Sequence, residues 1–404
     1  MSNTPRNLER PPEKVVSKSL LFIPGPVTVA ESVLLATAQP MIDHRGPEFK
    51  AILERIARRM MPIFGTRTAD VLLLGSSGTG GLEAAIANLF GAGDRLLVCP
   101  IGVFGERLVA IARTFGCEVD VLDTEWGAAV DASALRARIA AADRPYTGVL
   151  LTHNETSTGA QNDMAALSAA LQGCGALTVV DSVSGLAASD FRMDEWGFDV
   201  VVAASQKALA CPPGLAMVAV GPRAWDRMGT AHGGPRFYFD LRKAREFAAL
   251  GQTPWTPPVS IAFGLDAALD AFEQDGAGAV HERHARYARA IRAAAEALGL
   301  EVYSRDGAHS PTVVAIRVPA GIDGDAIRAS LRTSRGVIIG GGQKELKGKI
   351  IRIGTMGDLT QTDVVGALGA LEIALLEAGY SLHPGTGMQA ALKVFLEADQ
   401  PAAV

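Results

Sequence analysis

Cysteine is scarce in this chain, and long apolar runs are absent. The four cysteines, Cys99, Cys117, Cys174 and Cys211, form no C-x-x-C pair and no zinc-ligand spacing, which favours free thiols in a reducing compartment. No stretch reaches the roughly 18 apolar residues of a membrane span. The polar residues 1–18 contain no signal-peptide core. We therefore expect a cytoplasmic protein that does not bind a membrane and holds no metal.

The sequence also lacks a surplus of one charge. Its 43 acidic and 38 basic residues give a net charge of -5. Proteins that bind nucleic acid or an anionic membrane surface usually carry a clustered basic face. The mildly acidic balance gives no sign of such a face, so we expect no nucleic-acid partner.

Short apolar runs, by contrast, recur through the first two thirds of the chain and alternate with helical stretches. Most are continuously apolar, which is typical of strands covered by helices on both faces. The alternation predicts an α/β domain with a mostly parallel sheet. The expected strands cover residues 71–74, 95–99, 118–122, 147–152, 177–181, 199–203 and 215–220.

A Pro-rich stretch at residues 254–258 interrupts this pattern, and a mixed pattern follows it. A long helix is expected at about 280–298, and then strands at 312–318, 336–340 and 349–354 alternate with helices at 322–332 and about 361–378. We divide the chain into an N-terminal extension (1–20), a large domain (21–275), a smaller C-terminal α+β domain (276–385) and a C-terminal tail (386–404). Both ends are expected to be loose.

The segment Gly75-Ser-Ser-Gly-Thr-Gly-Gly81 lies between an expected strand and a helix starting near Leu82. Backbone N–H groups at such a turn can surround an anion, and the helix N-terminus adds partial positive charge. The spacing fits neither a P-loop nor a Rossmann fingerprint. The segment therefore favours a phosphate site, with an ordinary strand-to-helix turn as the alternative.

Asp181 and Lys207 each follow a continuously apolar strand. A carboxylate at a buried strand end is costly without a cationic partner, and a desolvated lysine has the lowered pKa that a Schiff-base lysine needs. Either residue alone could be a turn aspartate or a surface lysine. A phosphate turn, a strand-end Asp and a strand-end Lys in this order predict a site for pyridoxal 5'-phosphate (PLP).

Eight ordered stretches then carry a resemblance to a known family. They are Phe22-Ile-Pro-Gly-Pro26, Asp43-His-Arg-Gly-Pro47, Ser77-Gly-Thr79, Asn154-Glu-Thr-Ser-Thr-Gly159, Asp181-Ser-Val-Ser184, Ser205-Gln-Lys207, Thr253-Pro-Trp-Thr-Pro257 and Ile351-Arg-Ile-Gly354. The chain resembles the class V PLP-dependent aminotransferases, and among them the alanine–glyoxylate / serine–glyoxylate (serine–pyruvate) group. The resemblance implies PLP fold type I, an α/β fold with a mostly parallel seven-stranded sheet, flanking helices and a smaller C-terminal α+β domain.

The resemblance also implies roles in binding the cofactor. The turn at residues 77–79 and Gln206 would hold the phosphate, and Thr256 would reach it from the other subunit of a homodimer. Asp181 would pair with the ring nitrogen and Lys207 would bind the aldehyde, and these two are the implied catalytic residues. Two side chains would pack on the ring faces, and a threonine would bind the ring hydroxyl. The implied cofactor-binding residues are Ser77, Gly78, Thr79, Phe104, Thr156, Asp181, Val183, Gln206, Lys207 and Thr256.

For the substrate, the resemblance implies that the planar fork of Arg352 binds the α-carboxylate, and that Gly25 and Pro26 line the pocket. Position 253 is Thr where some members have a phosphate-binding Tyr, which weakens the match there. An acidic donor would require a second arginine, and only Arg45 and Arg236 are nearby candidates. We therefore expect a neutral donor.

The implied activity is transfer of an amino group from a small amino acid, serine or alanine, to glyoxylate or pyruvate. Ureidoglycine, aspartate, aminoethylphosphonate and pyridoxamine are alternative amines. A PLP lyase such as a cysteine desulfurase is disfavoured because Gln206 stands where those enzymes have His, and no cysteine follows Cys211. Asp181 and Lys207 argue against a binding protein that has lost the activity.

Overall fold

A seven-stranded sheet organises the first two thirds of the chain in the computed structural model, which describes residues 19–230 and 233–398. Its neighbouring strands are parallel except that β10 runs antiparallel to β2 and β9. The prediction of a mostly parallel sheet is confirmed. In spatial order the strands are β2 (Asp70–Gly75), β10 (Leu215–Val220), β9 (Val200–Ala204), β8 (Leu177–Asp181), β5 (Gly148–Thr152), β3 (Arg95–Cys99) and β4 (Glu118–Val121).

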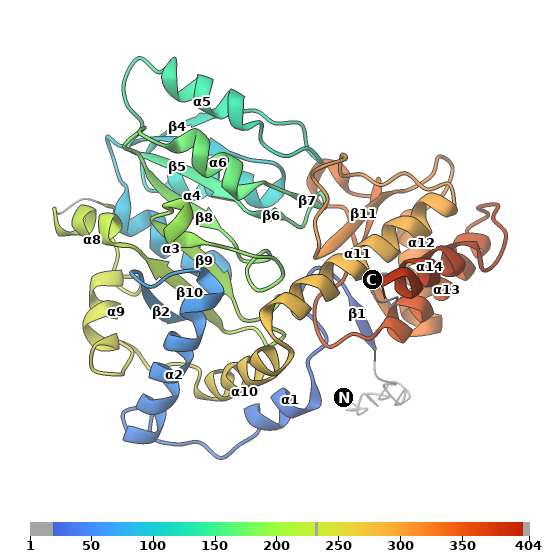
Figure 1. The fold of residues 1–404 in the computed structure, drawn as a ribbon, viewed down its shortest axis with the longest axis horizontal. Helices are drawn as coiled ribbons and strands as arrows, with labels where there is room; N and C mark the ends of the chain where they lie inside the picture. Colours follow the sequence, from blue (N-terminus) through green and yellow to red (C-terminus); the bar gives the residue numbers. More distant parts are fainter. Residues whose placement is uncertain (1–18, 231–232, 399–404) are drawn as a thin grey trace, which may run out of the picture.

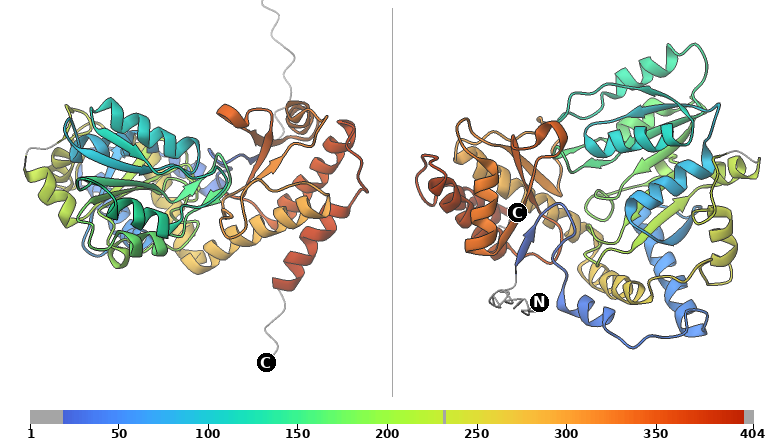
Figure 2. Two further views of the ribbon diagram at one scale, coloured as in Figure 1. Left: turned by 90° about the horizontal axis from the view of Figure 1, so that it is seen from above. Right: turned by 180° about the vertical axis from the view of Figure 1, so that it is seen from behind.

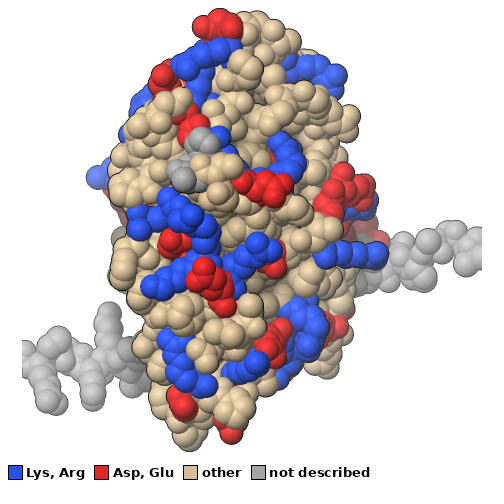
Figure 3. Space-filling model, turned by 90° about the vertical axis from the view of Figure 1, so that its left-hand side faces the viewer, with Lys and Arg blue, Asp and Glu red and all other residues tan. Residues whose placement is uncertain are grey.

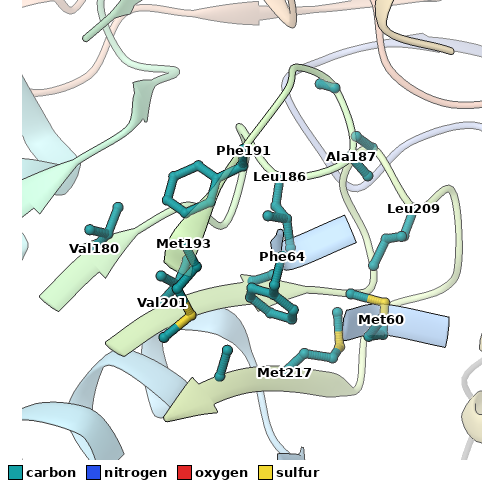
Figure 4. Packing of buried hydrophobic residues seen from close by; sticks show 14 of the residues in the cluster. Met60, Phe64, Val180, Leu186, Ala187, Phe191, Met193, Val201, Leu209 and Met217 are labelled. Carbon is teal, nitrogen blue, oxygen red and sulfur yellow. The ribbon is translucent and has the colours of Figure 1, made fainter. Parts of the chain in front are cut away.

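Helices cover both faces of this sheet (Figure 1). Along β8, Val180 faces a core shared with α1, α2, α5, α6 and α10, whereas Val179 faces a core shared with α3, α4, α8 and α9. On the first face, Met60 and Phe64 of α2 pack with Val201 and Met217 of the sheet (Figure 4). The helices are α1 (Glu31–Thr37), α2 (Pro47–Phe64), α3 (Gly78–Leu89), α4 (Val103–Thr114), α5 (Ala132–Ala140), α6 (Met164–Leu171), α7 (Met193–Trp196), α8 (Pro222–Gly229), α9 (Leu241–Ala248) and α10 (Val259–Asp275).

The second domain lies beside the first, and the long helix α11 (Ala277–Ala297) runs toward it (Figure 2). Its four-stranded sheet has the order β1 (Leu20–Phe22), β12 (Val337–Gly341), β13 (Ile350–Gly354) and β11 (Val313–Arg317). Helices α12 (Gly324–Arg335) and α13 (Gln361–Glu377) complete its core with α11.

Two of the expected boundaries need correction. Residues 20–22 pair in parallel with residues 337–339, so β1 belongs to the small sheet and not to the large domain. Residues 386–398 form helix α14 (Thr386–Ala398) instead of a loose tail. Phe395 of α14 is buried against Tyr287 of α11, with 6.0 Å between the ring centroids. Residues 1–18 of the expected extension and residues 399–404 lie outside the described residues.

Lysine and arginine are interspersed with aspartate and glutamate on the face of the large domain shown in Figure 3. Within the described ranges, no helix is both long and apolar enough to cross a membrane.

Candidate active site

A cavity of about 110 Å³ lies where β8 and β9 end. It brings together the expected cofactor-binding residues, with the exception of Thr256. Its lining residues are Ser77, Gly78, Thr79, Leu82, Phe104, Arg107, Asn154, Thr156, Asp181, Val183, Ser184, Gln206 and Lys207.

The turn after β2 forms one side of the cavity. Helix α3 begins at Gly78, earlier than the expected start near Leu82, because the Ser77 hydroxyl caps it by accepting a hydrogen bond from Gly80 N at 3.4 Å. A Cβ on Gly78 would lie 2.7 Å from Val183 Cγ2, so only glycine fits this close approach. The first N–H groups of α3 therefore meet the cavity at a helix end that favours an anion.

Asp181 ends β8 and is 4% exposed. Its Oδ1 accepts a hydrogen bond from Val183 N at 3.0 Å. Burial raises its pKa to about 6, while the Val183 N–H, Arg107 and Lys207 oppose the rise. The carboxylate is thus ionised at neutral pH but poorly compensated, and a cationic ligand group would stabilise it.

Lys207 follows β9, and burial lowers the pKa of its amine to about 8. The field of Asp181 raises this pKa, whereas Arg352 and Arg107 lower it. Its Nζ donates a hydrogen bond to Pro24 O at 2.5 Å. A Cβ on Gly25, where φ is +109°, would lie 2.8 Å from Lys207 Cδ. A lysine held this way exchanges protons near neutral pH.

Arg352 lies on β13 and is 7% exposed. Its Nε donates to Gly341 O at 2.8 Å and its Nη1 to Thr156 O at 2.7 Å, which ties the small domain to the cavity wall. Burial lowers its pKa to about 10, although the field of Glu155 opposes this. The arginine remains charged at neutral pH. Pro26 is exposed and does not line the cavity.

The sequence did not reveal the roles of two charged residues at the site, Glu155 and Arg107. Glu155 is fully buried, and its carboxylate accepts hydrogen bonds from Phe104 N at 2.9 Å, Gly105 N at 3.0 Å, and Ser157 N and Oγ at 3.0 and 2.6 Å. It caps α4, although no local pattern reveals a partner so far along the chain. Arg107 lines the cavity, and its position one helical turn after Phe104 was an available signal.

Thr256, which was expected at the cofactor, and the two candidate arginines, Arg45 and Arg236, lie away from the cavity. Thr256 lines a separate hollow together with Tyr238 and Trp255. Arg45 Nη1 donates to Gln252 Oε1 and Thr253 O, both at 2.8 Å. Arg236 Nη1 donates to Gly234 O at 2.8 Å. In the described part of one subunit, both arginines are bonded away from the cavity, so neither is placed to bind an acidic side chain there.

The sequence profile described as aminotransferase class-V matches residues 31–364. The chain belongs to the class V aminotransferases. It is 40% identical over 380 residues to a protein of Synechococcus sp. named soluble hydrogenase, small subunit, covering 93% of this chain and 98% of that one.

Two further relatives carry transaminase names. The chain is 37% identical over 382 residues to the L-aspartate–glyoxylate aminotransferase of Paracoccus denitrificans, covering 93% of this chain and 96% of the relative. It is 34% identical over 377 residues to the serine–glyoxylate aminotransferase of Arabidopsis thaliana, covering 92% of this chain and 94% of the relative.

Among solved structures, the chain is similar to pyridoxamine–pyruvate aminotransferase from Mesorhizobium loti, with a TM-score of 0.90 and 30% identity over 96% of this chain and 99% of that one. This class V transaminase therefore has the fold that the sequence predicted, and its family implies PLP.

Proposed function

We propose that this transaminase binds PLP in the cavity at the ends of β8 and β9, and moves an amino group from serine or alanine to glyoxylate or pyruvate. The observation that carries the proposal is the convergence of the α3 N-terminal turn, Asp181 and Lys207 on one cavity. Each of the three matches one part of PLP: the turn matches the phosphate, Asp181 the ring nitrogen and Lys207 the aldehyde.

The residues fit this cofactor in three respects. The α3 turn offers N–H groups and hydroxyls to a phosphate, and Asp181 offers a negative charge to a protonated ring nitrogen. Lys207 offers an amine to an aldehyde. The amide oxygen of Gln206 is buried without a hydrogen-bond partner among the described residues, so this amide is free to turn a donor toward the phosphate.

When bound, PLP supplies an electron sink for the charge left on the substrate carbon. Side chains of the protein supply proton transfer, the charge on the ring nitrogen and binding of the substrate carboxylate. Lys207 carries the proton away from the substrate carbon and returns it, and a pKa of about 8 keeps both protonation states accessible. Asp181 keeps the ring nitrogen charged. Arg352 retains Nη2, which has no hydrogen-bond partner in the described part of the chain, to bind the substrate carboxylate.

A neutral donor is favoured because Arg45 and Arg236 are engaged elsewhere. A donor panel tests this: serine, alanine and aspartate are each incubated with glyoxylate or pyruvate, and the keto acid formed is measured. We expect serine or alanine with glyoxylate to give the highest kcat/KM, and Lys207→Ala to be inactive with every pair. Aspartate as the best donor would overturn the donor assignment. No transfer from any amine would overturn the function.

A homodimer with shared sites is part of the proposal. Thr256 lies beside exposed aromatic side chains, including Phe237 at 73% exposure and Tyr238 at 47%. Such a patch is typical of a protein interface. Co-expression of Thr256→Asp and Lys207→Ala chains should restore activity that neither has alone, because one mixed site then receives both native residues. An active monomer in sedimentation would contradict the shared site.

A cytoplasmic location is also proposed, since Cys99, Cys117, Cys174 and Cys211 are all free thiols. Cell fractionation tests it, and recovery of the protein outside the cytoplasm would refute it.

A further inference from the structure

Arg107 lines the cavity and contacts both the phosphate turn and the expected stacking ring. It lies in the first turns of α4, and its Nη1 donates a hydrogen bond to Thr79 Oγ1 at 3.0 Å. Its guanidinium carbon lies 4.5 Å from the centroid of the Phe104 ring. Thr79 belongs to the first turn of α3, so this cation lies at the end of the cavity where backbone N–H groups already favour an anion.

No carboxylate pairs with Arg107 in residues 19–230 and 233–398. Two other arginines of the large domain differ from it. Arg59 pairs with Asp266, Asp270 and Glu273, and Arg95 pairs with Asp120 and Asp143.

The charge of Arg107 acts on the titrations of both Asp181 and Lys207. A cation that lines a cavity and pairs with no carboxylate is one that a ligand anion would stabilise.

The turn that carries Arg107 is fixed in advance. Glu155 accepts hydrogen bonds from Phe104 N and Gly105 N, which anchors the start of α4 to the strand ends. The neighbouring Glu106 forms an ion pair with Lys344 of the small domain. An arginine on a fixed turn requires little reorganisation to bind an anion, so little of its binding free energy is lost to ordering the side chain.

We propose that Arg107 is the cation of the phosphate subsite and binds the phosphate of PLP together with Thr79 and the α3 N-terminus. The inference rests on the proposed function, since it requires PLP in this cavity. A planar guanidinium offers a phosphate two parallel hydrogen bonds. This role also leaves Arg107 unavailable for an acidic donor side chain, which agrees with a neutral donor.

The test compares two aldehydes that differ only in the phosphate. Apoprotein is titrated with PLP and with pyridoxal, and the dissociation constants are measured by absorbance. Both aldehydes react with Lys207 in the same way, so the ratio of the two dissociation constants measures what the phosphate contributes to binding. Arg107→Gln should weaken PLP binding by about tenfold to a hundredfold and leave pyridoxal binding unchanged. Arg107→Lys keeps the charge but loses the planar fork, so its dissociation constant for PLP should lie between those of the wild type and Arg107→Gln.

Arg113→Gln is the matched control, because Arg113 is exposed near the end of the same helix and its loss changes the net charge equally. It should leave both constants unchanged. Equal weakening of PLP and pyridoxal by Arg107→Gln would overturn the proposal and assign Arg107 to packing on Phe104. Unchanged PLP binding with altered selectivity between aspartate and serine would overturn it in favour of a substrate carboxylate.

These outcomes are separable from failure of the proposed function, because the ratio of dissociation constants needs no turnover. If no amine in the donor panel reacts but Arg107→Gln still lowers PLP affinity selectively, the phosphate role stands and the reaction assignment fails. If the wild-type protein binds neither aldehyde in the cavity, both fail together.

Discussion

Two buried carboxylates of the same cavity region, Asp181 and Glu155, are satisfied very differently. Glu155 accepts four hydrogen bonds, from Phe104 N, Gly105 N, and Ser157 N and Oγ. Asp181 accepts one from Val183 N, and its carboxylate lines the cavity. Burial raises the pKa of both groups, but the surroundings compensate only Glu155 extensively.

The difference separates a structural carboxylate from one available to a ligand. Glu155 holds α4 in place and has little capacity left for another donor. Asp181 bears the cost of burial with little compensation, a condition found at functional sites more often than at structural ones. Replacing the two residues in the same way should therefore have opposite consequences for stability and chemistry.

The first and largest effect should come from Asp181→Asn. An amide cannot keep the ring nitrogen charged, so the rate of the first half-reaction should fall by about a hundredfold or more. The fold should be retained, because the side chain makes one hydrogen bond within residues 19–230 and 233–398. Single-turnover absorbance with serine measures the rate and circular dichroism checks the fold. A near-normal rate would remove Asp181 from the chemistry.

Arg352→Lys should raise KM for amino acid and keto acid together, by about tenfold to a hundredfold. A lysine retains the charge but cannot keep both hydrogen bonds, to Gly341 O and Thr156 O, and still bind a carboxylate. Steady-state kinetics with both substrates is the measurement. A change in kcat alone, with both KM values unaltered, would argue that Arg352 does not bind substrate.

The pKa of Lys207 predicts how capture of PLP depends on pH. Below a pKa of about 8 the amine is mainly protonated and unreactive, so the rate should fall about tenfold per pH unit and level off above pH 8. Stopped-flow mixing of apoprotein with PLP between about pH 6.5 and 10 follows it. A rate that keeps rising toward the ordinary lysine pKa of about 10.4 would show that the reactive amine is not buried.

Glu155→Gln should have the smallest effect on chemistry and a clear effect on stability. The amide keeps the shape but loses the charge-assisted hydrogen bonds at the start of α4, which should lower the free energy of unfolding by about 1–3 kcal/mol. Denaturant unfolding measures it, and kcat should change by only a few fold. A loss of activity equal to that of Asp181→Asn at unchanged stability would erase the distinction between the two carboxylates.

Much of the large domain could be predicted because its strands are buried on both faces, so they stand out as continuous apolar runs. Asp181 and Lys207 could be recognised because a charge at the end of such a run is conspicuous. The pairing of β1 with β12 could not be predicted, since a three-residue strand carries no signal for a partner at residues 337–339. The cap that Glu155 places on α4 likewise depends on tertiary contact.

Reductive trapping tests the central claim most directly. The protein is saturated with PLP, reduced with borohydride, digested and mapped by mass spectrometry. The account predicts one phosphopyridoxyl group per chain, on Lys207, whose amine is buried in the cavity with Asp181. A label on another lysine, or scattered among surface lysines at the level found for Lys207→Ala, would contradict it.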